Sequence, residues 1–152
     1  MGQKNKTCSK ELSEKVINAL ELDLTDMKIT GKRTLNLIGE LKDNELKELF
    51  SCNRFESNNK VYQMHEGSFL DIVSHNIDNN KVVNTIIDEA NRYGLADFQL
   101  TNQNSNDKST ALHWLATHNS PEVLYHALEI LGDKADEALT IKDKYGNPPY
   151  IH

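Results

Sequence analysis

Residues 110–116 read TALHWLA, and residues 68–74, about 42 positions earlier, read SFLDIVS. Each stretch opens with a hydroxyl residue, which favours a helix N-terminus, and continues with apolar residues at helical spacing. A polar segment follows each stretch, at residues 118–121 and 76–80, and a second apolar run comes after it. These second runs contain Val82, Val83, Ile86 and Ile87 in one unit, and Val123, Leu124, Ala127 and Leu128 in the other. The two units therefore predict the same pair of short antiparallel helices.

A glycine closes both units. Gly94 and Gly132 follow the second apolar runs, where a helix often ends on a residue with left-handed backbone conformation. Helix pairs that recur with a period near 40 residues are typical of helical solenoids, in which neighbouring units stack on one another. We therefore predict an all-α fold, a helical-repeat solenoid of helix-turn-helix units.

The last residues add a more specific signal. Residues 143–150 read DKYGNPPY, which resembles the turn and helix entry of an ankyrin repeat, D-x-x-G-x-T-P-L-H-x-A. The positions in register are Asp143, Gly146 and Pro149, and in the preceding unit Thr110, Leu112, His113 and Ala116. The departures are Lys108 at the glycine place, Ala111 at the proline place, Pro148 at the threonine place, Tyr150 at the leucine place and Ile151 at the histidine place. The resemblance is strong over residues 107–152, fair over 67–94 and weak over 31–50.

The resemblance implies how one unit holds the next. A threonine such as Thr110 caps the first helix, and a histidine such as His113 hydrogen-bonds backbone groups, which locks one turn to its neighbour. Gly146 supplies the positive φ of a tight turn. Because Lys108 stands where the other unit has glycine, we expect a less regular loop before Thr110.

The resemblance also implies a function. Ankyrin repeats mostly bind other proteins through the tips of their turns and the exposed side of their first helices. The partner-binding residues carried over to this chain are Asn106, Asp107, Ser109, Thr117, His118, Lys144, Tyr145 and Asn147. Tyr145 is the best single anchor, since it offers a large contact area and a hydroxyl, and its side chain loses little conformational entropy on binding. Trp114, the sole tryptophan, has two interpretations, as core between repeats or as a partner anchor.

The N-terminal third predicts a less regular helical cap over residues 9–60, before ankyrin-like repeats over 61–152. We expect residues 1–8 to be disordered, Ser9 to cap a helix, Gly31 to mark a turn and Asp43 to cap a third helix. The apolar stripe of the first helix is Leu12, Val16, Ile17, Ala19 and Leu20. Residues 51–60 are expected to form a loop, because no segment sustains the alternation of a strand. The last repeat is incomplete, so we expect that the natural protein continues past His152, the alternative being that this stub folds back over the repeat.

Composition excludes several classes of protein. The 152 residues carry a net charge of −6, which disfavours general binding to nucleic acids or anionic membranes. No apolar run approaches the roughly 18–20 residues of a membrane span, so we expect a soluble protein, and we favour a monomer. Cys8 and Cys52 are far apart in sequence and nothing near the N-terminus resembles a signal peptide, so we expect both cysteines to be reduced and the protein to be cytoplasmic. Abundant Asn and Lys suit an AT-rich genome such as that of an intracellular bacterium, which raises delivery into a host cell as a hypothesis.

The sequence contains no motif that indicates catalysis, a cofactor site or a metal site. It lacks GxSxG, a P-loop, GxGxxG and HExxH, and Cys52 has no nearby histidine to act as its base. We therefore expect no enzyme, no cofactor and a protein partner. Two alternatives stay open: a targeting or structural part of a larger protein, and a small metal-dependent hydrolase that uses His113, His118 and His126.

Overall fold

The structure is a computed structural model, and it describes residues 5–58, 64–117 and 120–149. These residues are mostly helical, in line with the expected fold class, with one short two-stranded sheet. Along the chain the elements are α1 (Lys10–Thr25), α2 (Lys32–Glu40), α3 (Asp43–Leu49), β1 (Arg54–Glu56), β2 (Met64–Glu66), α4 (Phe69–Asn76), α5 (Asn80–Arg92), α6 (Ala96–Thr101), α7 (Ala111–Thr117), α8 (Pro121–Leu131), a 3₁₀ turn (Gly132–Lys134) and α9 (Ala135–Ala138).

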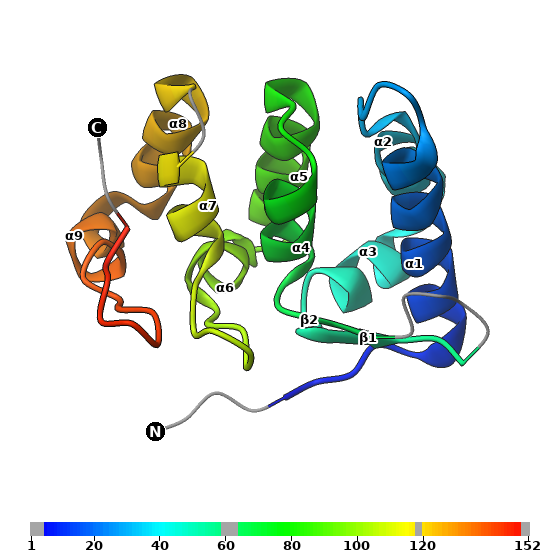
Figure 1. Ribbon diagram of the computed structural model, residues 1–152, viewed down its shortest axis with the longest axis horizontal. Coiled ribbons are helices and arrows are strands. Elements are labelled where there is room, and N and C mark those ends of the chain that lie inside the picture. Colours follow the sequence, from blue (N-terminus) through cyan, green and yellow to red (C-terminus); the bar gives the residue numbers. More distant parts are fainter. Residues whose placement is uncertain (1–4, 59–63, 118–119, 150–152) are drawn as a thin grey trace.

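Among the described residues, the longer helices form three antiparallel pairs that lie side by side (Figure 1). The pairs are α1 with α2, α4 with α5, and α7 with α8. A short helix follows each pair, namely α3, α6 and α9, and the loops after these short helices lie at the lower end in Figure 1. The apolar sides of the pairs form one continuous core. No helix in the described part of the chain combines the length and apolar character needed to cross a membrane.

The first pair forms as its apolar pattern predicts, and α1 continues past the last residue of its apolar stripe, Leu20. The Oγ of Ser9 accepts a hydrogen bond from the Leu12 amide, which confirms the predicted cap, and the five residues of the apolar stripe are buried. The helix continues to Thr25 because Asp23, which is fully buried, accepts hydrogen bonds from the amides of Arg33 and Thr34 at 2.8 and 2.9 Å. This carboxylate ties the end of α1 to the start of α2.

The third helix begins one residue earlier than predicted. Lys42, not Asp43, is its N-cap, and the Glu45 carboxylate accepts from the Lys42 amide at 3.0 Å. Asp43 is the first helical residue, and its carboxylate accepts a hydrogen bond from the Tyr93 hydroxyl at 2.7 Å. The side chain of Asp43 therefore joins α3 to the end of α5.

The expectation of a loop over residues 51–60 is wrong in part, because β1 lies there. It pairs with β2 in antiparallel register, with Phe55 opposite His65. Phe55 is fully buried, and its ring centroid lies 6.4 Å from that of Phe69 at the start of α4. The strands are three residues each, too short for alternation to reveal them, and the Phe55 contact with α4 holds them in place.

The cysteines and the N-terminal segment also differ from expectation. Cys8 and Cys52 form a disulfide, with their Cα atoms 5.4 Å apart and 44 positions apart in sequence. The expected disorder of residues 1–8 does not hold for residues 6–8, because the Cys8 amide donates to the Arg54 carbonyl and the Asn53 amide to the Lys6 carbonyl, both at 2.9 Å. Residues 1–4 lie outside the described part of the chain. The N-terminal segment thus runs beside β1.

The two aligned stretches form α4 and α7, the first helices of the second and third pairs. All seven residues from 68 to 74 are buried, and in 110–116 only Trp114 is partly exposed. Gly94 and Gly132 have positive φ angles of 72° and 56°, as predicted for helix ends. The connections after these glycines contain the short helices α6 and α9.

Candidate functional site

The loop at residues 104–109 enters α7 and is held by its own side chains. The Oδ1 of Asn104 accepts from the amides of Asn106 and Asp107 at 3.1 and 2.9 Å. The Oδ1 of Asp107 accepts from the amide and the hydroxyl of Ser109 at 3.0 and 2.7 Å. Lys108 has a φ of 63° and is the sole non-glycine residue in the described chain with positive φ. The expectation of an irregular loop is therefore wrong: lysine adopts the glycine conformation, and the hydrogen bonds hold it there.

The loop at residues 143–147 repeats this arrangement. The Oδ1 of Asp143 accepts from the amides of Tyr145 and Asn147, both at 2.9 Å. Gly146 has a φ of 83°, which confirms the predicted role of glycine in this turn. Both loops are thus organised by a short polar side chain that accepts from the amides following it.

The two loops are joined directly. The Lys144 amide donates to the Asp107 carbonyl at 2.7 Å. The Nε2 of Gln103 donates to the carbonyls of both Lys108 and Lys142 at 3.0 Å. Two of these hydrogen bonds, from Lys144 to Asp107 and from Gln103 to Lys142, therefore join one loop to the other.

His113 links the base of the same two loops. Its Nδ1 accepts from the Thr110 amide at 3.0 Å, so the ring proton resides on Nε2. The Nε2 then donates to the Asn147 carbonyl at 2.9 Å. This is the turn-to-turn link that the resemblance implied for histidine. Both ring nitrogens are occupied by these bonds, which leaves His113 without a free ligand atom for a metal.

Asp71 occupies in α4 the position that His113 occupies in α7, and it also reaches the loop that follows. Its Oδ2 accepts from the Asn104 amide group at 3.3 Å, and its Oδ1 accepts from the Trp114 indole at 2.7 Å. Burial is the main reason that the pKa of Asp71 rises to about 7, although both hydrogen bonds act in the opposite direction. A carboxyl of this pKa titrates near neutral pH.

These residues border a cavity of about 270 Å³ between β2, α4, α7 and the loop at 104–109. The described residues that line it are Met64, His65, Glu66, Asp71, Ile72, His75, Asn76, Asn104, Asn106, Asp107 and Trp114. The His75 ring stacks on Trp114 with centroids 4.0 Å apart and an interplanar angle of 7°. Burial lowers the pKa of His65. Burial would raise the pKa of Asp107, but hydrogen bonds from Ser109 and Asn104, together with the nearby His75 ring, hold the pKa below its ordinary value.

The structure places the sequence-predicted residues in three different environments. The exposed ones are Asn106, Thr117, Lys144, Tyr145 and Asn147. Asp107 is half-buried at the cavity, while Ser109 is buried and hydrogen-bonded inside its loop, so its side chain does not reach the surface. His118 lies outside the described residues. The two loops bring Asn106, Lys144, Tyr145 and Asn147 to one end of the molecule, whereas Thr117 lies at the other end of α7.

Sequence reasoning missed Asp71, His65, His75 and Asn104, and gave Trp114 mainly a core role. Trp114 is instead half-buried at the cavity wall. The signal for Asp71 was present: the alignment of 68–74 with 110–116 sets it opposite His113, as an acid in the linking position. No such signal existed for Asn104, which depends on the fold of its loop.

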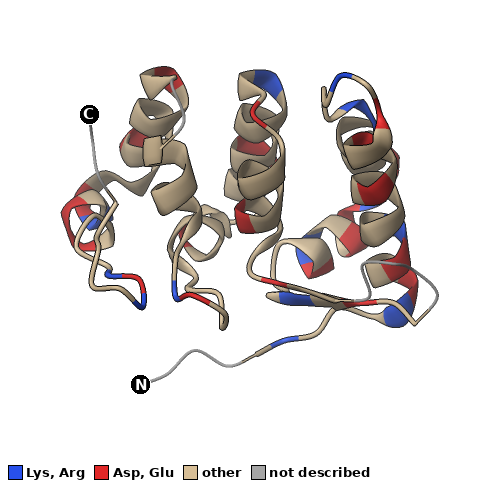
Figure 2. Ribbon diagram, in the orientation of Figure 1, with Lys and Arg blue, Asp and Glu red and all other residues tan. Residues whose placement is uncertain are grey.

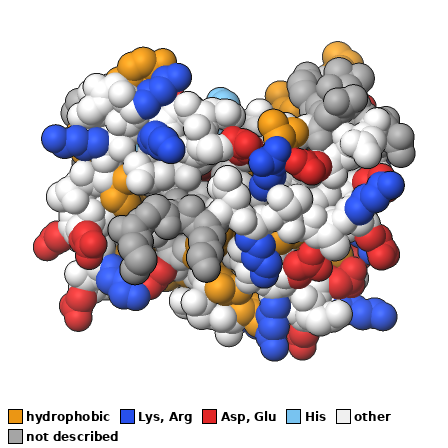
Figure 3. All heavy atoms as spheres, turned by 90° about the horizontal axis from the view of Figure 1, so that it is seen from below, with side chains coloured by type: hydrophobic (Ala, Val, Ile, Leu, Met, Phe, Trp, Pro, Cys, Tyr) orange, Lys and Arg blue, Asp and Glu red, His pale blue; other side chains and the backbone are white. Residues whose placement is uncertain are grey.

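Figure 3 shows the end of the molecule where the loops lie. Acidic and basic side chains are interspersed over the described surface, and Figure 2 shows the same mixture along the helices. A nucleic-acid backbone needs a surface dominated by Lys and Arg. The described surface at this end has no such character, in keeping with the net charge.

A larger cavity of about 730 Å³ lies between α6, α9 and the adjoining loops. The described residues that line it are Asn5, Asp97, Thr101, Gln103, Ser105, Lys108, Leu131, Lys134, Glu137, Ala138 and Ile141. Lys134 forms an ion pair with Asp97 across it. Its charges have both signs, so this space favours no particular ligand.

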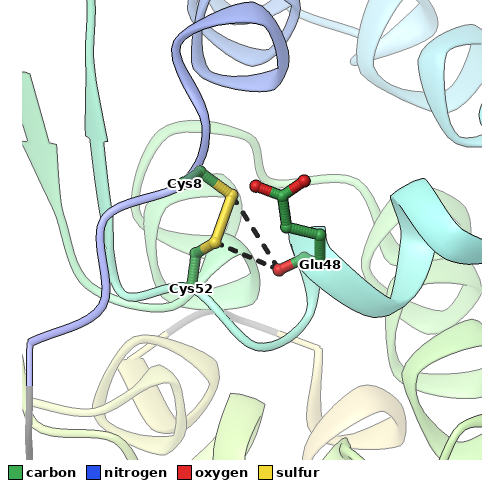
Figure 4. Close-up of side chains that lie close together, drawn as sticks. All are labelled: Cys8, Glu48 and Cys52. Atoms are coloured by element: carbon green, nitrogen blue, oxygen red, sulfur yellow. Dashed lines mark hydrogen bonds between the residues drawn. A yellow bond between two sulfur atoms is a disulfide. The ribbon is translucent and has the colours of Figure 1, made fainter.

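One cluster in the described chain has the residue types of a metal site. Cys8, Cys52 and Glu48 come together where the N-terminal segment meets the end of α3 (Figure 4). The two sulfur atoms are bonded to each other, so neither is a thiolate that could bind a metal. The Glu48 carboxylate accepts from the Ser9 amide at 2.7 Å, which gives it a structural role.

Comparison with models of known protein families, with curated proteins and with solved structures finds no match to this chain.

Proposed function

We propose that this chain is an ankyrin-like helical-repeat module that binds another protein through its loop tips and the accessible part of α7 at Trp114 and Thr117. The observation that carries the proposal is the direct hydrogen bond between the two loops, from the Lys144 amide to the Asp107 carbonyl. In stacked repeats the turns of neighbouring units lie next to one another, so a hydrogen bond between two successive turns is expected there.

Two equivalences support the stacking of repeats. Asp71 and His113 lie at matching helix positions and reach Asn104 and Asn147, which are 33 and 34 residues further along the chain. Lys108 and Gly146 lie at matching turn positions and share a positive φ. Each matching helix position thus contacts the turn that follows, Asp71 through the Asn104 side chain and His113 through the Asn147 carbonyl.

The properties of the loop tips support binding. Loops that are already fixed by hydrogen bonds lose little conformational entropy when a partner docks. Tyr145 is 73% exposed, and the Lys144 ammonium lies 5.1 Å from the centre of its ring. A tyrosine held on a rigid turn is a typical interface anchor.

Paired tyrosine variants test this proposal. Tyr145→Ala removes the anchor, and Tyr125→Ala removes a tyrosine that is 57% exposed on α8, away from the loops. Proteins captured on the wild-type chain should be lost with Tyr145→Ala and retained with Tyr125→Ala. Equal capture by both variants, or selective loss with Tyr125→Ala, would contradict the proposal.

A further inference from the structure

Among the described residues, the cavity between α4 and α7 is lined by acidic side chains without a lysine or arginine among them. The three carboxylic acids of this described lining are Glu66, Asp71 and Asp107. This differs from the mixed charges over the rest of the loop end. Of the two cavities described above, this one therefore favours a positively charged ligand, whereas the other has charges of both signs.

Three basic side chains lie near these acids, namely Arg54, His65 and His75, and Asp71 is only partly ionised near pH 7 because its pKa is raised to about 7. Arg54 approaches Glu66 at 3.9 Å, but its guanidinium also lies 2.8 Å from Glu56. His65 is kept neutral at pH 7, because its pKa lies below the ordinary value near 6.5. Asp107 stays ionised, since its pKa lies below the ordinary value. A cation that entered the cavity would find Asp107 charged and Asp71 next to it.

Asp71 has remaining capacity to accept hydrogen bonds. A carboxylate offers about four acceptor positions, and Asp71 uses one for Trp114 and one, at the long distance of 3.3 Å, for Asn104. Side chains of Lys and Arg donate three and five hydrogen bonds, respectively, and have long apolar stems. The apolar wall for such a stem is Ile72 together with the Trp114 ring, one face of which is stacked on His75.

We infer that this cavity receives a lysine or arginine side chain of the bound protein, with its stem against Trp114 and its charged end near Asp71 and Asp107. The inference rests on the proposed function, because it names what the partner inserts beside the loop tips. Asn106 and Asp107 belong both to the cavity wall and to the loop that Lys144 joins, so one partner segment could cover the cavity and the tips together.

The sole tryptophan makes the cavity directly measurable. Trp114 is the one tryptophan of the chain, and it lines the cavity, so intrinsic fluorescence reports on occupancy. The probes are blocked amino acids at constant ionic strength: N-acetyl-lysine amide, N-acetyl-norleucine amide of nearly the same stem without the charge, and N-acetyl-glutamate amide. We expect a saturable fluorescence change with the lysine probe, and affinity at least about tenfold weaker for the other two.

Two variants test the assigned acids, and a third variant serves as the control. Asp107→Asn keeps the oxygen that accepts from Ser109 and removes the charge, so lysine-probe affinity should fall at least about fivefold. Asp71→Asn should weaken it as well, and thermal unfolding followed by circular dichroism establishes that each variant folds. Asp136→Asn, on the exposed side of α9, removes one charge elsewhere and should leave affinity unchanged.

The possible failures are distinguishable. A norleucine probe that binds as tightly as lysine, or an affinity that Asp107→Asn leaves unchanged, would overturn the inference about the cavity. The capture experiment with Tyr145→Ala and Tyr125→Ala is independent of those titrations. If the lysine probe gives no response while capture still depends on Tyr145, the inference about the cavity is wrong and the proposed binding function is unaffected.

Discussion

Lys108 adopts the same left-handed backbone conformation as Gly146, with φ angles of 63° and 83° in two matching turns. A side chain with a Cβ costs about 1–2 kcal/mol in this conformation, and glycine does not. The lysine is held there by hydrogen bonds on both sides: its amide donates to the Asn104 carbonyl, and its carbonyl accepts from Gln103. The loop network thus imposes a conformation that the residue itself disfavours.

Lys108→Gly should stabilise the protein by about 0.5–1 kcal/mol, because relief of the strain exceeds the added entropy of the unfolded chain. Urea unfolding measures the change. Lys108→Ala is the matched control, since alanine keeps the Cβ and loses only the rest of the side chain. Equal stability of the glycine and alanine variants would show that the backbone conformation carries no strain.

His113→Ala should destabilise the chain by about 1–3 kcal/mol, because the Thr110 amide and the Asn147 carbonyl both lose their partner. Hydrogen exchange at the Thr110 amide should accelerate as well. His126→Ala is the control, since His126 lies at the surface of α8 and contacts Asp88 there. A comparable loss of stability in both histidine variants would argue against the turn-to-turn link.

Asp71 should make stability depend on pH. Its pKa is about 7 in the folded protein and near 3.8 in the unfolded chain, so between these values the folded state binds a proton that the unfolded state does not. The free energy of unfolding should therefore fall as pH rises from about 4 to 7, by at most about 4 kcal/mol. Asp107, whose pKa is lowered, contributes in the opposite sense.

Urea unfolding of wild type and Asp71→Asn at several pH values isolates this contribution, because the other groups titrate in both proteins. The stability of wild type relative to the variant should decrease from pH 4 to pH 7. A relative stability that stays constant over this range would mean that Asp71 titrates normally.

Loss of the Cys8–Cys52 disulfide should destabilise the protein by about 4 kcal/mol in the chain-entropy estimate for a loop of this length, with 44 positions between the cysteines. Paired Cys→Ser substitutions, or unfolding with and without reductant, measure the change. Thiol labelling of the untreated protein should find neither cysteine free. Because disulfides persist mainly in oxidising compartments, the same labelling in cells also tests the expected cytoplasmic location.

The features that the sequence predicts well are local. Ser9 caps its helix because a hydroxyl before an apolar stripe needs no distant partner, and Gly94 and Gly132 adopt positive φ where the stripes end. The recurrence of residues 68–74 at 110–116 likewise predicts two equivalent buried helices, because the apolar spacing alone defines their inner sides.

The features that were missed depend on contacts between distant parts of the chain. Cys8 meets Cys52 through the pairing of the N-terminal segment with β1, and β1 itself depends on the burial of Phe55 against Phe69. The cavity brings Asp71 together with Asn104 and Trp114, which lie 33 and 43 residues further along the chain. Periodicity and motif spacing contain no information on such contacts.

Site-specific photo-crosslinking tests the central claim, that a protein docks on the joined loops, most directly. A benzophenone amino acid at position 145 lies on the loop tip, and one at position 125 lies on α8 with comparable exposure. The account predicts a discrete cross-linked protein from position 145 and none from position 125. Cross-links from position 125 alone, or the same products from both positions, would contradict it.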